Sequence, residues 1–109
     1  MDNDAMVVAC LCAAWCDICT AWQPEFDALA RRFPAVRFTW IDIEDHADAL
    51  ADFDPENFPV LAVQRGAALL YCSTVPQHSG TWERLIDAYL SGEAPPRPAQ
   101  ALPDLRRFP

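Results

Sequence analysis

The sequence predicts an α/β fold with the element order βαβαββα. An apolar run at residues 6–14 precedes an amphipathic helical pattern at 17–33, and two later apolar runs are separated by a turn. A run that is apolar on both alternating faces is typical of a central strand, whereas apolar residues three and four apart form one face of a helix. With 109 residues, 52% of them hydrophobic, the chain can bury the core of one domain.

The first βαβ unit occupies residues 6–44. Its apolar run is expected to form a strand that is covered on both faces. The helical pattern at 17–33 contains Pro24, which removes one backbone hydrogen bond and bends the helix, and Pro34 ends the helix. Residues 36–44 alternate apolar and polar side chains before the phase shifts, so they predict the second strand.

A short helix with an acidic start is predicted at residues 45–53. The apolar runs at 59–64 and 67–74 flank Arg65 and Gly66, which predicts an antiparallel hairpin. Glycine is favoured at such turns because it adopts backbone conformations that other residues avoid.

The last predicted helix begins at Ser79, the expected N-cap, and ends at Gly92. We therefore place one domain at residues 1–92. Residues 93–109 form a tail that holds five of the ten prolines, and we expect no regular structure there. The tail contains three large apolar side chains that could dock on the domain, namely Leu102, Leu105 and Phe108.

The composition narrows the functional classes. A formal net charge of −8 argues against nucleic-acid binding, because there is no basic surface to neutralise phosphates, and it favours neutral or basic partners. The longest apolar run is about half a membrane span, and the chain opens with acidic residues where a secretory signal would be basic. We therefore expect a cytoplasmic protein with no membrane partner.

The motif Trp15-Cys16-Asp17-Ile18-Cys19 stands where the first strand gives way to the first helix. At a helix N-terminus, unpaired backbone N–H groups carry partial positive charge, which favours the thiolate that attacks disulfides. The carboxylate of Asp17 opposes this effect, so we expect the Cys16 thiol to be less acidic than one beside an imidazolium or at a bare helix end. The reduction potential of the Cys16/Cys19 couple should then lie toward the reducing end. Cys19, one helical turn further on, can resolve a mixed disulfide.

This motif and this element order resemble the thioredoxin family. The resemblance also rests on four positions at the family's spacings, namely Trp15, Pro24, Pro59 and Gly66. It implies a thioredoxin-like domain at residues 1–92, with a four-stranded mixed sheet and helices on both faces.

The resemblance further implies where a substrate binds. The Phe58–Pro59 bond is expected to be cis, with the backbone of Phe58 available to pair with an extended peptide. Trp15 is expected to form an apolar surface beside Cys16 that contacts the substrate.

Several features depart from the family pattern. Full-length thioredoxins begin with an extra strand and helix that we expect this chain to lack. The strand at 36–43 is then an open edge, covered by the tail or by a second chain. Cys10 stands where the family has a buried aspartate that assists proton transfer, and the partner lysine falls at about Trp40. Asp17 and Ile18 replace the family's Gly-Pro.

The other cysteines leave alternatives open. Cys10 and Cys12 lie two apart on a strand and share a face, where both could be small buried hydrophobic residues. Cys10 could instead pair with Cys19 in an alternative disulfide. The four cysteines of residues 10–19 also suggest a zinc or iron–sulfur site. Two ligands within an apolar strand, however, cannot easily adopt the tetrahedral geometry that such a site needs. Cys72 is expected to be a core or edge residue.

The sequence therefore predicts a thiol–disulfide oxidoreductase that acts on disulfide-containing proteins and contributes to redox homeostasis. We expect no cofactor and no metal, with reducing equivalents from a reductase or a thiol such as glutathione. The chain would be a monomer, or a weak dimer through the open edge strand. The alternative is a non-catalytic thioredoxin-like binding or chaperone module with a redox-sensitive cysteine pair.

Overall fold

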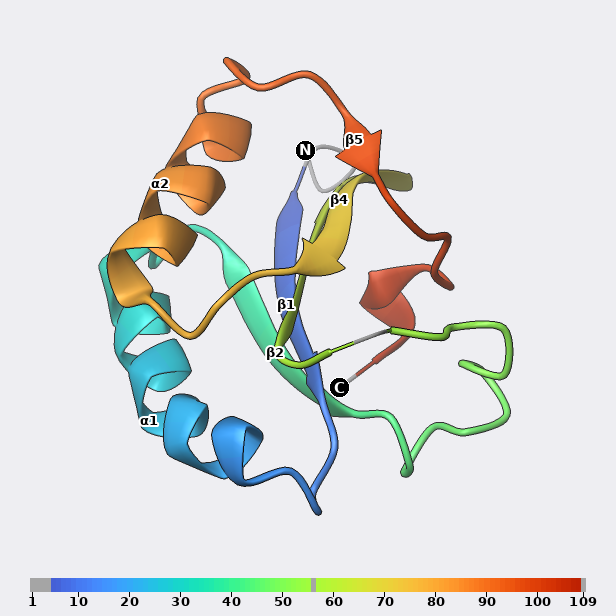
Figure 1. Cartoon of the computed structure of the whole chain (residues 1–109). Coiled ribbons are helices and arrows are strands. Elements are labelled where there is room, and N and C mark those ends of the chain that lie inside the picture. Colours follow the sequence, from blue (N-terminus) through green and yellow to red (C-terminus); the bar gives the residue numbers. More distant parts are fainter. Residues whose placement is uncertain (1–4, 56, 109) are drawn as a thin grey trace.

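The computed structural model describes residues 5–55 and 57–108, which are built around one five-stranded mixed sheet (Figure 1). The strands are β1 (Met6–Cys12), β2 (Arg37–Asp42), β3 (Val60–Arg65), β4 (Ala68–Thr74) and β5 (Arg97–Pro98). The helices are α1 (Asp17–Arg32), α2 (Ser79–Leu90) and the short 3-10 helix η2 (Leu105–Arg107). None of the helices in this described part is long and apolar enough to cross a membrane.

Strand β1 lies at the centre of the sheet, as its apolar run predicts. The order is β2-β1-β3-β4-β5, with β1 parallel to β2 and antiparallel to β3. All seven residues of β1 are buried, because side chains on both of its faces are covered. The predicted hairpin is confirmed as β3 and β4, and Gly66 adopts a positive φ of 56° at its turn.

The two α-helices cover the same face of the sheet (Figure 1). Their apolar side chains pack on alternate residues of β1, among them Val8, Cys10 and Cys12. Trp22 of α1 meets Trp82 of α2 with ring centroids 4.9 Å apart. The mixed α/β fold is confirmed, but its helices are distributed differently from the prediction.

The opposite face is covered by turns, the tail and η2 (Figure 1). The helix predicted at residues 45–53 is wrong, because this segment consists of turns. The side chain of Asp42 accepts a 2.9 Å hydrogen bond from the Glu44 backbone N–H, which sets a turn where a helix would begin. Only Leu50 of the segment is buried, so it has no apolar face that could stabilise a helix by packing.

The tail is ordered, which corrects the expectation that it lacks regular structure. Its strand β5 pairs in parallel with β4 and adds a fifth strand to the four that were predicted. The edge that it covers is therefore that of β4, and β2 remains at the other edge of the described sheet. The Arg37 guanidinium at the start of β2 donates a hydrogen bond to the carbonyl oxygen of Phe108 in the tail. This contact does not add a strand beside β2.

The tail docks because it satisfies a buried polar side chain. Gln64 of β3 is 1% exposed, and its Oε1 accepts a 2.7 Å hydrogen bond from the Leu105 backbone N–H. Buried polar groups need such partners, and Leu105 itself is fully buried. The proposed boundary at residue 92 therefore divides elements that share one core.

Helix α2 has the predicted extent but a different N-cap. The residue in the cap position is His78, whose Nδ1 accepts a hydrogen bond from the Thr81 backbone N–H. Ser79, the expected cap, is the first helical residue. The helix ends as predicted at Ser91 and Gly92, where the glycine has a φ of 80°.

Candidate active site

Cys16 is the N-cap residue of α1 and is partly exposed. Its backbone is extended, with φ −92° and ψ 117°, and its N–H donates a 3.0 Å hydrogen bond to the Ala13 carbonyl oxygen. The turn at residues 13–16 thus carries the chain from the end of β1 to the positive end of the helix. The thiol of Cys16 is free, as attack on a disulfide requires.

Cys19 is bonded to Cys12 and not to Cys16. The disulfide joins the first turn of α1 to the last residue of β1, with 5.8 Å between the two Cα atoms. Both partners are buried, with Cys12 1% and Cys19 2% exposed. Cys12 shares a sheet face with Cys10 and Val8, and this is the face on which α1 lies.

The remaining cysteines are free and buried in the core. Cys10 lies beneath the helices, where burial holds the pKa of its thiol far above the usual range. Cys72 lies on the opposite face, and burial raises the pKa of its thiol to about 11. The structure thus supports the hydrophobic interpretation for Cys10 and the expected core position for Cys72, whereas Cys12, given the same hydrophobic interpretation as Cys10, is disulfide-bonded. It does not contain the alternative Cys10–Cys19 disulfide, because Cys19 is bonded to Cys12.

A groove of about 440 Å³ opens beside the free thiol of Cys16. Its lining includes Trp15, which is 67% exposed, together with Ile18 and the loop before β3. The ring of Trp15 meets that of Phe58 edge to face, with centroids 5.9 Å apart. The remaining lining residues are Ile43, Phe53, Asp54, Pro55 and Asn57.

The Phe58–Pro59 bond is cis, which confirms that expectation. Pro59 is buried and leads into β3, while Phe58 remains at the groove. The Thr74 hydroxyl donates a 2.9 Å hydrogen bond to the Asn57 carbonyl oxygen and so ties this loop to β4. The structure thus brings Trp15, Cys16 and Phe58 together from two segments that are about forty residues apart.

Sequence reasoning missed two kinds of residue at the site. The lining of the groove includes Phe53, which the mistaken helix at 45–53 contained, and Asp54, which follows that segment. Cys12 was weighed only as a hydrophobic residue or a metal ligand. Its position on the helix-covered face could have been found from strand alternation, but not which cysteine of that face meets Cys19.

Asp17 and Ile18 separate the two motif cysteines at the start of α1. Both are exposed, Ile18 toward the groove. Asp17 is an acidic residue in the first turn, a position where the helix dipole favours negative charge.

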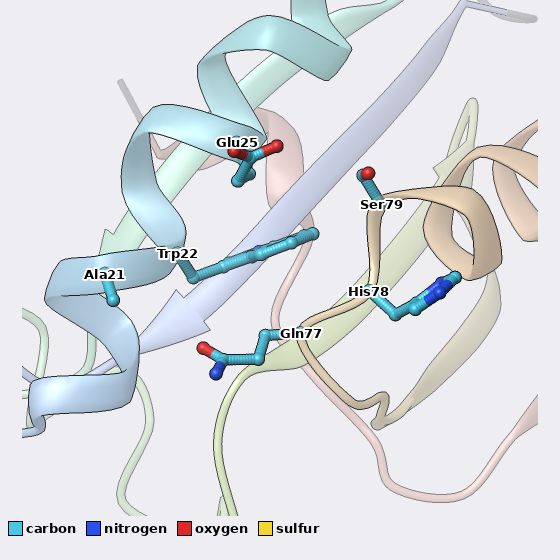
Figure 2. Close-up of a pocket in the computed structure, with 6 residues that line it drawn as sticks. All are labelled: Ala21, Trp22, Glu25, Gln77, His78 and Ser79. Carbon is cyan, nitrogen blue, oxygen red and sulfur yellow. The ribbon is translucent and has the colours of Figure 1, made fainter.

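A second hollow of about 370 Å³ lies between α1 and the segment before α2 (Figure 2). In Figure 2 the Trp22 ring lies between the side chains of Glu25 and Gln77, while the His78 ring points away toward α2. His78 serves there as the helix cap, and no cysteine lines the hollow. Within residues 5–55 and 57–108, no three His, Cys, Asp or Glu side chains are placed to hold a metal ion.

Comparison with known proteins decides the family. The family model described as Thioredoxin matches residues 1–84. The chain belongs to the thioredoxin family. It is 33% identical over 51 residues to the thioredoxin of Mycoplasma genitalium, covering 47% of this chain and 50% of that protein. It is 34% identical over 57 residues to the thioredoxin of Oryctolagus cuniculus, covering 52% of this chain and 54% of that protein. The chain thus spans about half the length of the curated relatives that it matches.

Solved thioredoxin structures share the fold. The thioredoxin of Fasciola hepatica superposes with a TM-score of 0.70 at 20% identity, over 79% of this chain and 82% of that one. The thioredoxin of Trypanosoma brucei brucei gives a TM-score of 0.70 at 20% identity, over 84% of this chain and 80% of that one. At this identity the likeness concerns the fold alone.

The structure places the two residues that stand at the family's proton-relay positions next to each other. Cys10 of β1 is paired in register with Trp40 of β2. Neither a thiol in an apolar core nor an indole can serve as the carboxylate–ammonium pair that the resemblance to thioredoxins implies at these positions.

Proposed function

We propose that this chain catalyses thiol–disulfide exchange on disulfide-containing proteins, with Cys16 as the attacking thiol. The observation that carries the proposal is the position of Cys16, a free and partly exposed thiol at the N-terminus of α1 beside the groove. Cys10 and Cys72, the other free thiols, are buried. The thioredoxin family to which the chain belongs consists of thiol–disulfide oxidoreductases, which supports this activity at the family level.

The proposed reaction is a two-step reduction. The Cys16 thiolate attacks one sulfur of the substrate disulfide, which forms a mixed disulfide and releases the other sulfur as a thiolate that takes up a proton. Reduced Cys19 then attacks the Cys16 sulfur, so the second substrate thiol leaves and a Cys16–Cys19 disulfide forms. A reductase or a small thiol returns the pair to the dithiol. The Cys12–Cys19 disulfide must be open for Cys19 to act.

The groove is proposed to hold the substrate chain. Trp15 and Phe58, whose rings meet edge to face, offer apolar surface beside Cys16. A peptide in extended conformation could pair with the backbone of Phe58. Asp54 adds a carboxylate to the wall, which together with the net charge of −8 favours neutral or basic substrates.

Deprotonation of Cys19 is proposed to limit turnover. Cys10 and Trp40 occupy the positions where the resemblance implies a proton relay, so water or the Cys16 sulfur must take the proton. We therefore expect a slow enzyme. The cytoplasmic location and the monomeric or weakly dimeric state remain predictions from the sequence.

An insulin-type disulfide reduction assay tests this function. We expect the wild type to reduce the substrate with dithiothreitol as electron donor, Cys16→Ser to lose that activity, and Cys72→Ser, altered on the opposite face, to keep it. If the wild type and Cys16→Ser both reduce insulin no faster than dithiothreitol alone, the proposed enzymatic function is excluded.

A second candidate function has one observation in its favour. Because Cys19 is tied to Cys12 inside the core, the disulfide could act as a redox-sensitive staple in a non-catalytic binding or chaperone module. In that case the protein would bind unfolded chains equally well with and without Cys16. The Cys16→Ser variant therefore separates the two functions.

A further inference from the structure

We propose that Cys12 is a third redox residue, and that the disulfide of Cys19 moves between Cys12 and Cys16 by internal exchange. This inference rests on the proposed function, because it adds a step after Cys19 has resolved the mixed disulfide. The observation behind it is the Cys12–Cys19 bond itself, which leaves the motif cysteine Cys16 free.

Cys19 has a cysteine neighbour on each of two sides. Toward the sheet it is bonded to Cys12, with 5.8 Å between the Cα atoms. Along the helix it lies three residues after Cys16, a spacing that places side chains about 5–6 Å apart at Cβ. Cys16 also packs against the same apolar cluster that contains Cys12 and Cys19. The Cα separation of Cys12 and Cys19 lies within the range of a disulfide. A Cys16–Cys19 bond requires the extended N-cap residue Cys16 to approach Cys19 by about 1–2 Å at Cβ.

The exchange is balanced without an external oxidant. The Cys12 thiolate attacks the Cys19 sulfur of the Cys16–Cys19 disulfide. The Cys12–Cys19 bond forms, the Cys16–Cys19 bond breaks, and Cys16 leaves as a thiolate that takes up a proton. One disulfide and one thiol are present before and after, so no electrons enter or leave the chain.

The environments of the two outer cysteines give the exchange a direction. Cys16 stands at the positive end of α1 with access to water, so it is the better leaving thiolate. Cys12 is enclosed in the core, where a thiolate is disfavoured and a disulfide carries no charge to desolvate. The Cys12–Cys19 form is therefore the resting oxidised state, as the structure has it.

The exchange has two functional consequences. The Cys12–Cys19 disulfide is shielded from external thiols because neither sulfur-bearing residue is exposed beyond 2%. A reductant therefore reaches it only through Cys16, by the reverse of the same step. In addition, Cys16 becomes a free thiol again while the chain is still oxidised, so it can react once more with a substrate or with glutathione.

The test follows the reduced full-length chain after it reacts with one molar equivalent of 5,5′-dithiobis(2-nitrobenzoate), which the partly exposed Cys16 thiol attacks first. A first thionitrobenzoate is released on that attack, and a second when Cys19 displaces it from Cys16. The chain is then quenched in acid at successive times and its disulfides are mapped by mass spectrometry. Chymotrypsin cleaves after Trp15 and Asp-N protease before Asp17, so Cys12 and Cys19 fall on separate peptides and Cys16 is released as a single residue that adds its mass to the peptide it is bonded to.

We expect the Cys16–Cys19 disulfide to appear as the second thionitrobenzoate is released. It should then convert into the Cys12–Cys19 disulfide without release of further thionitrobenzoate. Cys12→Ala should stop at Cys16–Cys19, and Cys72→Ala, equally buried on the opposite face, should behave as the wild type. In the final state, alkylation of Cys16 by iodoacetamide should be at least tenfold faster in the wild type than in Cys12→Ala.

Three outcomes overturn the proposal. A wild type that remains at Cys16–Cys19, or that forms Cys12–Cys19 without passing through Cys16–Cys19, lacks the exchange but keeps the proposed enzymatic function if insulin is reduced. If the second thionitrobenzoate is not released, Cys19 does not resolve the mixed disulfide on Cys16. That outcome overturns both the exchange and the proposed enzymatic function. The wild-type time course involves no substitution, so it decides the question even if Cys12→Ala does not fold.

Discussion

Gln64 Nε2 donates a 2.6 Å hydrogen bond to Asp104 Oδ1 and thereby joins the middle of the sheet to the tail. The same amide nitrogen donates to the Gly66 carbonyl oxygen at 2.7 Å, while Oε1 accepts from the Leu105 N–H. One buried side chain thus fixes both the β3–β4 turn and the start of η2. The tail is held by specific polar contacts as well as by apolar burial.

Replacing Gln64 by Leu should destabilise the chain. The substitution keeps the size of the side chain but leaves the buried Leu105 N–H without its partner, and an unsatisfied buried group costs about 1–3 kcal/mol. The free energy of unfolding, measured by urea denaturation, should fall by that amount. Gln23→Leu, at an exposed position of α1, is the control and should change little. Equal stability of the Gln64 variant and the wild type would contradict the role of this side chain.

Stability should fall at acid pH through Asp104. The hydrogen bond from the Arg106 side chain, followed by that from Gln64, holds the pKa of this carboxyl well below its usual range. A carboxyl whose pKa is lowered on folding contributes stability above its unfolded pKa of about 4 and loses it as the pH falls toward the folded value. The wild type should therefore lose more unfolding free energy than Asp104→Asn when the pH is lowered from about 5 to 2.5. Parallel losses in both proteins would show that another group is responsible.

The groove should matter more for protein substrates than for small disulfides. Trp15→Ala and Phe58→Ala remove apolar surface beside Cys16 while leaving its thiol in place. We expect kcat/KM for insulin reduction to fall about tenfold, in line with the loss of 1–2 kcal/mol from a buried aromatic contact. The rate of reaction with 5,5′-dithiobis(2-nitrobenzoate) should change less than twofold. Leu90→Ala, an exposed apolar residue at the end of α2, is the matched control.

A uniform loss toward both kinds of substrate would show that these aromatic side chains position Cys16 and do not bind the peptide. Circular dichroism of the Trp15 variant should match the wild type, because that side chain is mostly exposed.

The sequence predicts those elements whose periodicity is long and whose burial is complete. The apolar run of β1 and the stripe of Trp22, Phe26 and Leu29 in α1 each bury one continuous surface, so local pattern and tertiary structure agree. The segment at 45–53 fails because its aspartates favour turns, and the packing of Leu50 is compatible with either conformation.

The sequence predicts which residues gather at the candidate site, but not which cysteines are bonded to each other there. The positions of Cys16, Trp15 and Pro59 follow from the motif and its spacing. The bond between Cys12 and Cys19 depends on how the first turn of α1 sits on the end of β1, which no one-dimensional pattern contains. The ordering of the tail likewise depends on Gln64, a polar residue whose burial within an apolar strand is not visible from its neighbours.

The tail should be part of the folding unit, contrary to a boundary at residue 92. Leu105 and Phe108 pack on the face of the sheet formed by Val7, Ala9 and Leu11, so a chain that stops at Gly92 exposes this surface. Each large side chain that loses its burial costs about 1.5–3 kcal/mol, and the unpaired Gln64 adds to that sum.

We therefore expect the truncated chain to be less stable than the full chain by at least about 3 kcal/mol in urea denaturation. Leu105→Ala alone should lose about 2–5 kcal/mol, as full burial predicts, whereas Leu102→Ala, at a half-buried position, should lose less. If the chain that ends at Gly92 unfolds at the same urea concentration and with the same slope as the full chain, the tail is an appendage. The two-part division made from the sequence would then hold.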